Sequence, residues 1–519
     1  MTDAPTLRLE SVERYERDVT LRLPFRFGVI TVTHSTQAVI RATIALPDGR
    51  TATGVAAETL AAKWFDKNLA YSDAQNLDQL RQALDISIDL YRARGWSTAF
   101  DLYADTYRDQ LARGAALDLV PLVASYGPAL LDRAILDALG RAGGWSFADM
   151  IRHNIPGIRL TDLTPDLAGA DFDTFLAGLK PGAAIDVRHT VGLVDPIVAA
   201  DQKPGERVDD GLPETLEEVV RHYRGRYYKL KVGGDVRADL DRLSRIAAVL
   251  DRDAGAYQAT LDGNEQYDDV EGIGELWRRM AETPGLRRLV GSILFIEQPI
   301  KRAVALSRPV ESLARHKALI IDESDGELAT FPAALALGYA GVSSKNCKGF
   351  YKSILNAARV ARLNAAAGAA RYFMSAEDLT TLAGISVQQD LALVSLLGLI
   401  HVERNGHHFI DGMSFAPEAE QASFAAAHPD LYDRSGGPAR LRITGGTLQL
   451  GSLACPGFAV GGDTDITALR PMPAAPKARI VSDPGRAGGV RPASGESFAF
   501  AGHERAGGPR SQEKTEGKP

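Results

Sequence analysis

The feature of the sequence that most constrains the fold is a series of charged residues, each of which follows a short apolar stretch. The stretches read as five successive strands, and the residues at their ends are Lys229-Leu230-Lys231, Asp262, Glu297, Asp322 and Lys345. Amphipathic segments lie between the strands, for example residues 236–250, whose apolar residues recur at helical spacing. Strands that alternate with helices predict a parallel sheet.

Charged groups at the carboxyl ends of consecutive parallel strands favour a closed (β/α) barrel, because the active site of a barrel forms at that end. An open doubly wound sheet would place its site at one switch point instead. Lys229 and Lys231 are two residues apart on a strand, so both side chains point to the same face, here the barrel interior. If their strand is the second and the strand before Lys345 is the sixth of eight, the lysines face each other across the barrel mouth.

Three carboxylates are expected on the strands between these lysines. Asp262, Glu297 and Asp322 would converge from one side, and such an oxygen-rich set suits Mg²⁺. An Asp before Gly is most often a turn residue. Three carboxylates on consecutive strands, beside lysines that a barrel interior would otherwise tolerate poorly, favour a metal site. Asp322 and Glu323 are adjacent and point to opposite faces, so only one of them can bind the metal.

The series resembles the enolase superfamily, and within it the muconate-lactonizing subgroup of the mandelate racemase/muconate lactonizing enzyme family. The matching segments are Lys-Leu-Lys at 229–231, Leu-Asp-Gly-Asn at 261–264, Ile-Glu-Gln-Pro at 296–299, Ile-Asp-Glu-Ser at 321–324 and Ser-Ser-Lys-Asn-Cys-Lys-Gly at 343–349. The resemblance covers residues 7–471. It implies an α/β TIM-type barrel with an α+β capping domain, built from the N-terminal region and a returning C-terminal segment.

The resemblance also implies the chemistry of the site. Asp262, Glu297 and Asp322 would bind Mg²⁺, with Mn²⁺ as an alternative, and the metal would stabilise an enediolate formed by loss of the proton α to a substrate carboxylate. Lys231 and Lys345 would transfer the proton, with Lys348 as an alternative to Lys345. Lys229 would support Lys231, and we expect like charge to lower the pKa of a lysine in this pair. The outcome is racemisation or epimerisation, or else cycloisomerisation or β-elimination.

Further polar residues are candidates for binding substrate or supporting the site: Asn264, Glu323, Glu377, Asp378, Asp411 and Arg26. Glu377 and Asp378 follow a predicted seventh strand at 371–374, and Asp411 ends a predicted eighth strand at 408–412. Acidic groups there suggest an amino or hydroxyl function on the substrate. Arg26 belongs to residues 24–28, which resemble a capping segment that contacts substrate. For Phe25 and Phe27 a role in the core is an equally open interpretation.

The chain divides into four predicted parts. Residues 1–158 form the capping domain, with a hairpin that turns at Pro47-Asp48-Gly49. Residues 159–440 form the barrel, whose first strand is predicted at 185–191. Residues 441–472 return to the capping domain. Residues 473–519 contain few large apolar side chains, and we expect them to be disordered.

Composition narrows the function classes. A net charge of −7 over 519 residues does not indicate a basic surface of the kind that binds nucleic acid. We find no apolar stretch of signal-peptide or membrane-spanning length, and two distant cysteines do not suggest a disulfide framework. We therefore expect a cytoplasmic homo-oligomeric enzyme that acts on a small carboxylate. Two alternatives stay open: a Schiff-base aldolase with Lys231 or Lys345 as the amine, which leaves three carboxylates unexplained, and a non-catalytic binding barrel.

Overall fold

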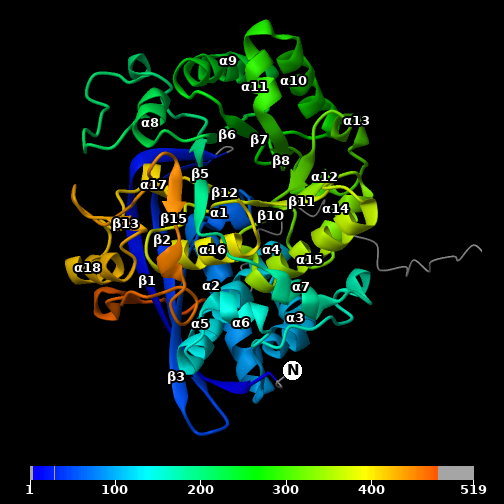
Figure 1. The fold of residues 1–519 in the computed structure, drawn as a ribbon, viewed down its shortest axis with the longest axis vertical. Helices are drawn as coiled ribbons and strands as arrows, with labels where there is room; N and C mark the ends of the chain where they lie inside the picture. Colours follow the sequence, from blue (N-terminus) through cyan, green and yellow to red (C-terminus); the bar gives the residue numbers. More distant parts are fainter. Residues whose placement is uncertain (1–3, 28–29, 477–519) are drawn as a thin grey trace, which may run out of the picture. The chain divides into compact units, whose positions relative to one another are not determined.

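The computed structural model describes residues 4–27 and 30–476. These residues form an eight-stranded parallel barrel and an antiparallel sheet with its own helices (Figure 1). The predicted fold class, a TIM-type barrel with an α+β cap, is confirmed. Gly28 and residues 477–519 of the tail predicted at 473–519 lie outside the described residues. Within the described ranges, no helix has the length and apolar character needed to cross a membrane.

The barrel strands follow one another in sequence order, and β12 closes the barrel by pairing with β5. Their bounds are β5 Ala184–Val191, β6 Tyr227–Lys231, β7 Gln258–Asp262, β8 Ile293–Glu297, β9 Leu319–Ile321, β10 Gly341–Ser344, β11 Phe373–Ala376 and β12 His401–Arg404. The strand that carries Lys231 is therefore the second and the strand that precedes Lys345 is the sixth, as predicted.

Helices follow the strands on the outside of the barrel. They include α8 Leu216–Tyr223, α9 Val236–Asp253, α10 Val270–Glu282, α11 Arg287–Ser292, α12 Arg302–Ala305, α13 Glu311–Ala314, α14 Thr330–Ala336, α15 Phe350–Ala367 and α16 Ile385–Leu396. Helix α9 shows why the sequence folds in this way. The Asp235 side chain caps its start by accepting hydrogen bonds from two backbone N–H groups. Leu243, Ile246 and Leu250, at helical spacing, are buried against the barrel.

The capping domain is built on three long antiparallel strands, β1 Thr6–Phe27, β2 Ile30–Ala45 and β3 Thr51–Thr59. The hairpin predicted around Pro47-Asp48-Gly49 joins β2 to β3, with Ala45 paired to Thr51. Gly49 has a φ of +86°, a conformation that favours glycine. The helices that cover this sheet include α2 Asp73–Arg94, α3 Ala99–Ala115 and α5 Tyr126–Gly143.

The segment that follows the barrel returns to the N-terminal sheet. Strand β15 (Thr447–Gln449) pairs antiparallel with β5, and β16 (Arg470–Pro471) pairs antiparallel with β1. In Figure 1 the orange to red part of the chain accordingly runs back toward the blue strands. The bounds 441–472 of the returning segment stay a prediction.

The prediction of the eighth strand was wrong. The strand is β12, His401–Arg404, and the predicted residues 408–412 include the end of a short helix, α17 (Gly406–Phe409). The apolar character of that segment has another cause. Phe409 and Ile410 pack in a small cluster against capping residues of β1 and a barrel loop, namely Val19, Leu21, Phe25 and Leu382. Asp411 therefore does not end a barrel strand.

We predict that Gly54→Ala destabilises the capping domain by about 1–3 kcal/mol or more, because it overpacks the contact between β3 and α5. A Cβ at Gly54 would lie 2.2 Å from the backbone nitrogen of Ala138 and 2.3 Å from the carbonyl oxygen of Ala134. The matched control is Gly274→Ala on α10, where a Cβ would meet nothing within 4 Å. That change should be neutral or stabilising by up to ~1 kcal/mol. Urea denaturation of both variants tests the prediction, and equal stabilities would contradict it.

Candidate active site

Strand register brings three of the predicted site residues into one layer at the carboxyl end of the barrel. Lys231 on β6 lies opposite Asp262 on β7, and Asp262 lies opposite Glu297 on β8. All three side chains are buried. The Nζ of Lys231 donates to Oδ2 of Asp262 at 2.5 Å.

Lys229 lies among four carboxylates that come from four different strands or strand ends. Its Nζ is 3.0 Å from Asp262, 2.7 Å from Glu297, 2.7 Å from Glu377 and 2.9 Å from Glu403. Burial alone would lower the pKa of Lys229, but these carboxylates outweigh it and raise the pKa well above its ordinary value. This direction is opposite to the lowering that we expected for a lysine beside another lysine.

Asp322 organises the other half of the site. Its Oδ2 accepts a hydrogen bond from Lys345 at 2.6 Å, and its Oδ1 accepts one from Ser343 and one from Lys348, the latter at 3.2 Å. Burial would lower the pKa of Lys345, yet the charge of Asp322 outweighs it and the pKa rises. Lys345 therefore carries a proton in this arrangement. Lys348 contacts Oδ1 of Asp322, whereas Lys345 contacts Oδ2, and Lys348 does not line the cavity described below.

Gln298 holds the strand ends in register. Its Oε1 accepts hydrogen bonds from the backbone N–H groups of Asp322, at 2.8 Å, and Ser324, at 3.1 Å. Gln298 and Asn264 have φ angles of 31° and 40°, which are strained for residues other than glycine. The strain falls directly after Glu297 and two residues after Asp262, as is common where a scaffold fixes functional groups.

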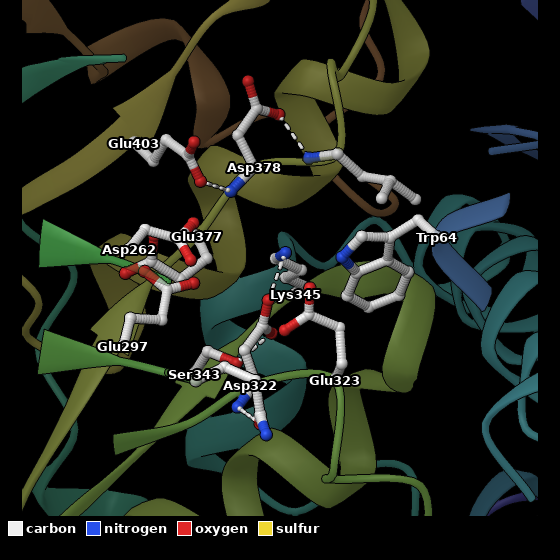
Figure 2. Close-up of polar contacts among 12 residues, drawn as sticks. Trp64, Asp262, Glu297, Asp322, Glu323, Ser343, Lys345, Glu377, Asp378 and Glu403 are labelled. Atoms are coloured by element: carbon white, nitrogen blue, oxygen red, sulfur yellow. Dashed lines mark hydrogen bonds and ion pairs between the residues drawn. The ribbon is translucent and has the colours of Figure 1, made fainter. Parts of the chain in front are cut away.

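The capping domain closes over the barrel mouth through Trp64. Lys345 Nζ lies 4.3 Å from the centroid of the Trp64 ring, and Figure 2 shows the two side chains next to each other. Two charged side chains, one from the barrel and one from the cap, connect the backbone around Trp64 to the barrel. Arg302 donates to the carbonyl oxygens of Trp64 and Phe65, both at 2.8 Å, and Lys67 donates to the carbonyl oxygen of Asn264 at 2.8 Å.

A small cavity of about 40 Å³ remains between the cap and the barrel. Lys231 and Lys345 both line it, although they come from the second and sixth strands. Its other walls are Phe25, Ala61, Trp64, Asn264, Asp378, Leu379, Thr380, Glu403 and Asn405. The Oδ1 atoms of Asn264 and Asn405 are buried and accept no hydrogen bond from the described protein residues. The cavity thus offers two amine groups and two unused acceptors.

The six residues predicted to bind substrate or support the site do not lie together in the structure, and only some of them line the cavity. Asn264 lines the cavity, and its Nδ2 donates to Glu323 at 3.2 Å. Asp378 also lines the cavity, but its carboxylate accepts from the backbone N–H groups of Leu379, Thr381 and Asn405. Glu377 is fully buried beside Lys229. Arg26 lies on β1, opposite Thr31.

Asp411 is placed away from these residues. It is partly exposed and pairs with Arg440, whose Nε lies 2.5 Å from Oδ1 of Asp411. This placement follows from the corrected position of the eighth strand. A role for Asp411 at the strand end is therefore not supported by the geometry.

The sequence interpretation missed Glu403, Arg188 and Trp64. Glu403 lies on β12, and its Oε1 accepts from Thr190 Oγ1 at 2.6 Å. Arg188 lies on β5 and pairs with Glu377 in the barrel interior. A partial signal for Glu403 was available, because the apolar residues Leu399, Ile400 and Val402 precede a carboxylate, as at the other strand ends, although His401 interrupts them.

The site suits a divalent cation by charge and by donor type. Burial, together with the nearby charges of Asp262 and Glu377, raises the pKa of Glu297 well above its ordinary value even though Lys229 lies beside it. Asp262, Glu297 and Asp322 present only oxygen donors, which Mg²⁺ prefers. Among residues 4–27 and 30–476 no three His, Cys, Asp or Glu side chains lie close enough to share one ion. Here the ammonium groups of Lys229, Lys231 and Lys345 contact these carboxylates, as Figure 2 shows for Lys345 and Asp322.

No protein-family model and no curated protein sequence matches the chain. Solved structures share its fold. An enolase from Bradyrhizobium, complexed with magnesium and mandelic acid, aligns with a TM-score of 0.55 at 16% identity, over 90% of this chain and 98% of the other. A muconate lactonizing enzyme from Mycobacterium smegmatis, complexed with muconolactone, gives 0.54 at 18%, over 89% and 99%. A dipeptide epimerase from Enterococcus faecalis, complexed with Mg and L-Leu-L-Tyr, gives 0.53 at 13%, over 88% and 99%.

We predict that Arg188→Met lowers the free energy of unfolding by about 3–5 kcal/mol at neutral pH, because it removes one partner of a buried ion pair. Both side chains of the Arg188–Glu377 pair are fully buried. Burial alone would raise the pKa of Glu377, but the charges of Arg188 and Lys229 outweigh it and lower this pKa to about 2. This stabilisation is present above pH ~4.3, the ordinary pKa of Glu, and is lost as the pH falls toward 2. The difference between wild type and variant should therefore shrink on acidification.

Denaturant titrations at several pH values measure this effect. The control is Arg226→Met, which breaks a pair in which the Arg226 side chain is 61% exposed and should cost at most about 1 kcal/mol. Adding Glu377→Gln to Arg188→Met should restore part of the loss, because the buried carboxylate that has lost its arginine partner is gone. A loss that does not change between neutral pH and pH ~3 would contradict the assignment.

Proposed function

We propose that the chain is an enzyme that removes the proton α to the carboxylate of a small substrate. Lys231 and Lys345 would transfer the proton, Lys229 would support the site, and Asp262, Glu297 and Asp322 would hold Mg²⁺ or Mn²⁺. The observation that carries the proposal is that Lys231 and Lys345 line one cavity from opposite strands of the barrel, next to Asp262 and Asp322.

The carboxylates prepare the site for a metal-assisted reaction. Bound Mg²⁺ would act as a Lewis acid that stabilises the negative charge developing on the substrate carboxylate. Two of these residues are positioned through the backbone: Asp262 accepts from the N–H of Asn264 at 2.8 Å, and the N–H of Asp322 donates to Gln298 at 2.8 Å.

The two lysines differ in what they can do as they stand. Lys345 is a proton donor in this arrangement, because Asp322 raises its pKa. Lys231 is fixed by Asp262 through a 2.5 Å hydrogen bond and faces the same cavity. A substrate whose α-carbon lies between the two nitrogens could lose a proton to one lysine and receive a proton from the other. That sequence is racemisation or epimerisation.

A substrate with a leaving group on its β-carbon would follow a different course. After the α-proton is lost to one lysine, the β-substituent would leave, which gives cycloisomerisation or β-elimination. Both courses use the same lysines, so the outcome depends on the substrate. Trp64 and Phe25 cover the cavity and would exclude water from the reacting carbon.

The cavity lining suggests which substrates fit. Asn264 and Asn405 line the cavity, and the Oδ1 atom of each is buried without a hydrogen-bond partner among the described residues. These oxygens would suit a hydroxyl or amino group on the substrate. Mandelic acid and the dipeptide L-Leu-L-Tyr, bound in two of the similar structures, are carboxylic acids that carry such groups.

The proposal predicts metal-dependent exchange of a carbon-bound proton. A panel of hydroxy acids, amino acid derivatives and dipeptides, incubated in D₂O with Mg²⁺, should contain at least one compound that gains deuterium at the α-carbon, measured by NMR. Chelation should abolish the exchange and Mg²⁺ or Mn²⁺ should restore it. Glu297→Gln should weaken metal binding, because a neutral amide oxygen replaces an anionic ligand.

Full exchange in the presence of a chelator would refute the metal-dependent mechanism. If borohydride instead traps a substrate on Lys231 or Lys345, the chain is a Schiff-base aldolase. The absence of both exchange and trapping across the panel would favour a non-catalytic binding barrel.

We further predict that the two lysines serve opposite faces of the α-carbon. Lys231→Ala should lower deuterium incorporation into one enantiomer by ~10²–10⁴-fold and largely spare the other, and Lys345→Ala should show the reverse. The physical reason is their placement four strands apart in the barrel, on either side of one cavity. NMR of each separate enantiomer in D₂O measures the effect.

The control is Lys203→Ala, which removes an amine whose side chain is 83% exposed and should leave exchange unchanged. Exchange of both enantiomers by both site variants would show that the bases lie elsewhere. If the wild-type enzyme exchanges the α-proton of only one enantiomer, the reaction takes place on one face of the α-carbon, as in β-elimination.

A further inference from the structure

The carboxylates around Lys229 fall into two groups that differ in their other partners. Glu377 accepts additional hydrogen bonds from Arg188 and from Ser375 Oγ, the latter at 2.5 Å. Glu403 accepts from Thr190 Oγ1 at 2.6 Å and from the backbone N–H of Asp378 at 2.8 Å. These two carboxylates are therefore fixed even without Lys229.

Asp262 and Glu297 form the second group. Asp262 is shared between Lys229 and Lys231, which lie 3.0 Å and 2.5 Å from its Oδ2. The only side-chain partner of Glu297 among residues 4–27 and 30–476 is Lys229, at 2.7 Å. The ammonium of Lys229 thus contacts carboxylates of two kinds. Glu377 and Glu403 are held by further donors, and Asp262 and Glu297 are proposed metal ligands.

We propose that Lys229 is a displaceable counter-ion of the metal ligands, and that Glu377 and Glu403 form the fixed seat that holds it when a divalent cation takes over Asp262 and Glu297. This inference rests on the proposed metal site and adds positioning roles for Glu377 and Glu403. Neither residue needs to touch the substrate for these roles.

The electrostatics of the barrel interior require such a seat. A divalent cation bound to Asp262 and Glu297 would repel an ammonium a few ångströms away, since like charges interact strongly in a buried site. An ammonium that lost those partners without gaining others would be a buried uncompensated charge, which costs several kcal/mol in general. Glu377 and Glu403, at 2.7 Å and 2.9 Å, keep Lys229 compensated.

Glu403 has a second possible role, because it also lines the cavity. Its contacts argue for the seat. Oε1 accepts from Thr190, and Oε2 accepts from both Asp378 and Lys229, so both oxygens are engaged. The cavity acceptors without partners are instead those of Asn264 and Asn405.

A double-mutant cycle on Mn²⁺ binding tests the inference without any substrate. Mn²⁺ affinity would be measured by electron paramagnetic resonance for wild type, Lys229→Met, Glu403→Gln and the double variant. Lys229→Met should tighten Mn²⁺ binding, because the competing ammonium is removed. Glu403→Gln should weaken it at least about tenfold, because Lys229 then relies more on the metal ligands. In the Lys229→Met background, Glu403→Gln should have little effect.

The control is Glu420→Gln, which neutralises a different buried carboxylate. Glu420 pairs with Arg17 and not with Lys229, so this change should leave Mn²⁺ affinity unchanged. A simple long-range attraction between Glu403 and the metal predicts the opposite pattern, namely an equal or larger loss when Lys229 is absent. That pattern, or weaker Mn²⁺ binding by Lys229→Met, would overturn the inference. No Mn²⁺ binding by wild type would overturn the proposed metal site as well.

If Lys229→Met does not fold, crystallography of the wild-type protein tests the inference instead. Wild-type crystals with and without Mn²⁺, with the ion located by anomalous scattering, would show the position of Lys229 directly. In the metal-bound crystal the Nζ should remain within hydrogen-bond distance of Glu377 and Glu403 and should have left Glu297. An Nζ that stays on Glu297 beside the ion, or leaves Glu403, would contradict the seat.

Discussion

The rest of the structure depends on the balance of buried charge along the barrel axis. Carboxylates from β7, β8 and β12, and from the residue that follows β11, reach one ammonium, Lys229, and Arg188 from β5 pairs with one of them. A barrel interior filled with apolar side chains would be easier to fold, since buried ion pairs seldom add net stability over apolar packing. The charge is therefore better explained by function than by stability.

The capping domain depends on this balance as well as on apolar packing. Lys67 of the capping segment lies 2.6 Å from Glu265 and 3.6 Å from Glu323, and Arg302 of the barrel reaches back to the backbone of Trp64 and Phe65. Carboxylates just beyond the ends of β7 and β9 thus contact the cap, while Asp262 and Asp322 contact the barrel lysines. Trp64 of the cap lies over Lys345 and lines the cavity, and charge interactions are stronger in such a low-dielectric setting than in water.

Much of the fold and part of the site could be predicted from the sequence, for a physical reason. Apolar runs that end in a charge indicate both the strand and the position of its carboxyl end, so the sequence places Lys231, Asp262, Glu297 and Lys345 at strand ends, where the structure also has them. The eighth strand was missed because it contains His401, Glu403 and Arg404, whose polarity reflects pairing inside the protein. Phe409 and Ile410 looked like a strand because they pack against the cap. Contacts between distant segments, such as Lys229 with Glu403, are not encoded in local patterns.

The two lysines of β6 illustrate how depth in the barrel can divide one residue type between two roles. Lys229 and Lys231 share a face, but their positions differ by two residues, or roughly 6–7 Å along a strand. Lys231 lies in the layer of Asp262 and Glu297 and reaches the cavity, whereas Lys229 lies opposite Thr260, one layer deeper, and does not line it. The deeper lysine meets carboxylates on all sides, which fixes its charge. The upper lysine has one carboxylate partner and an open side, and that openness is what a proton-transfer group requires.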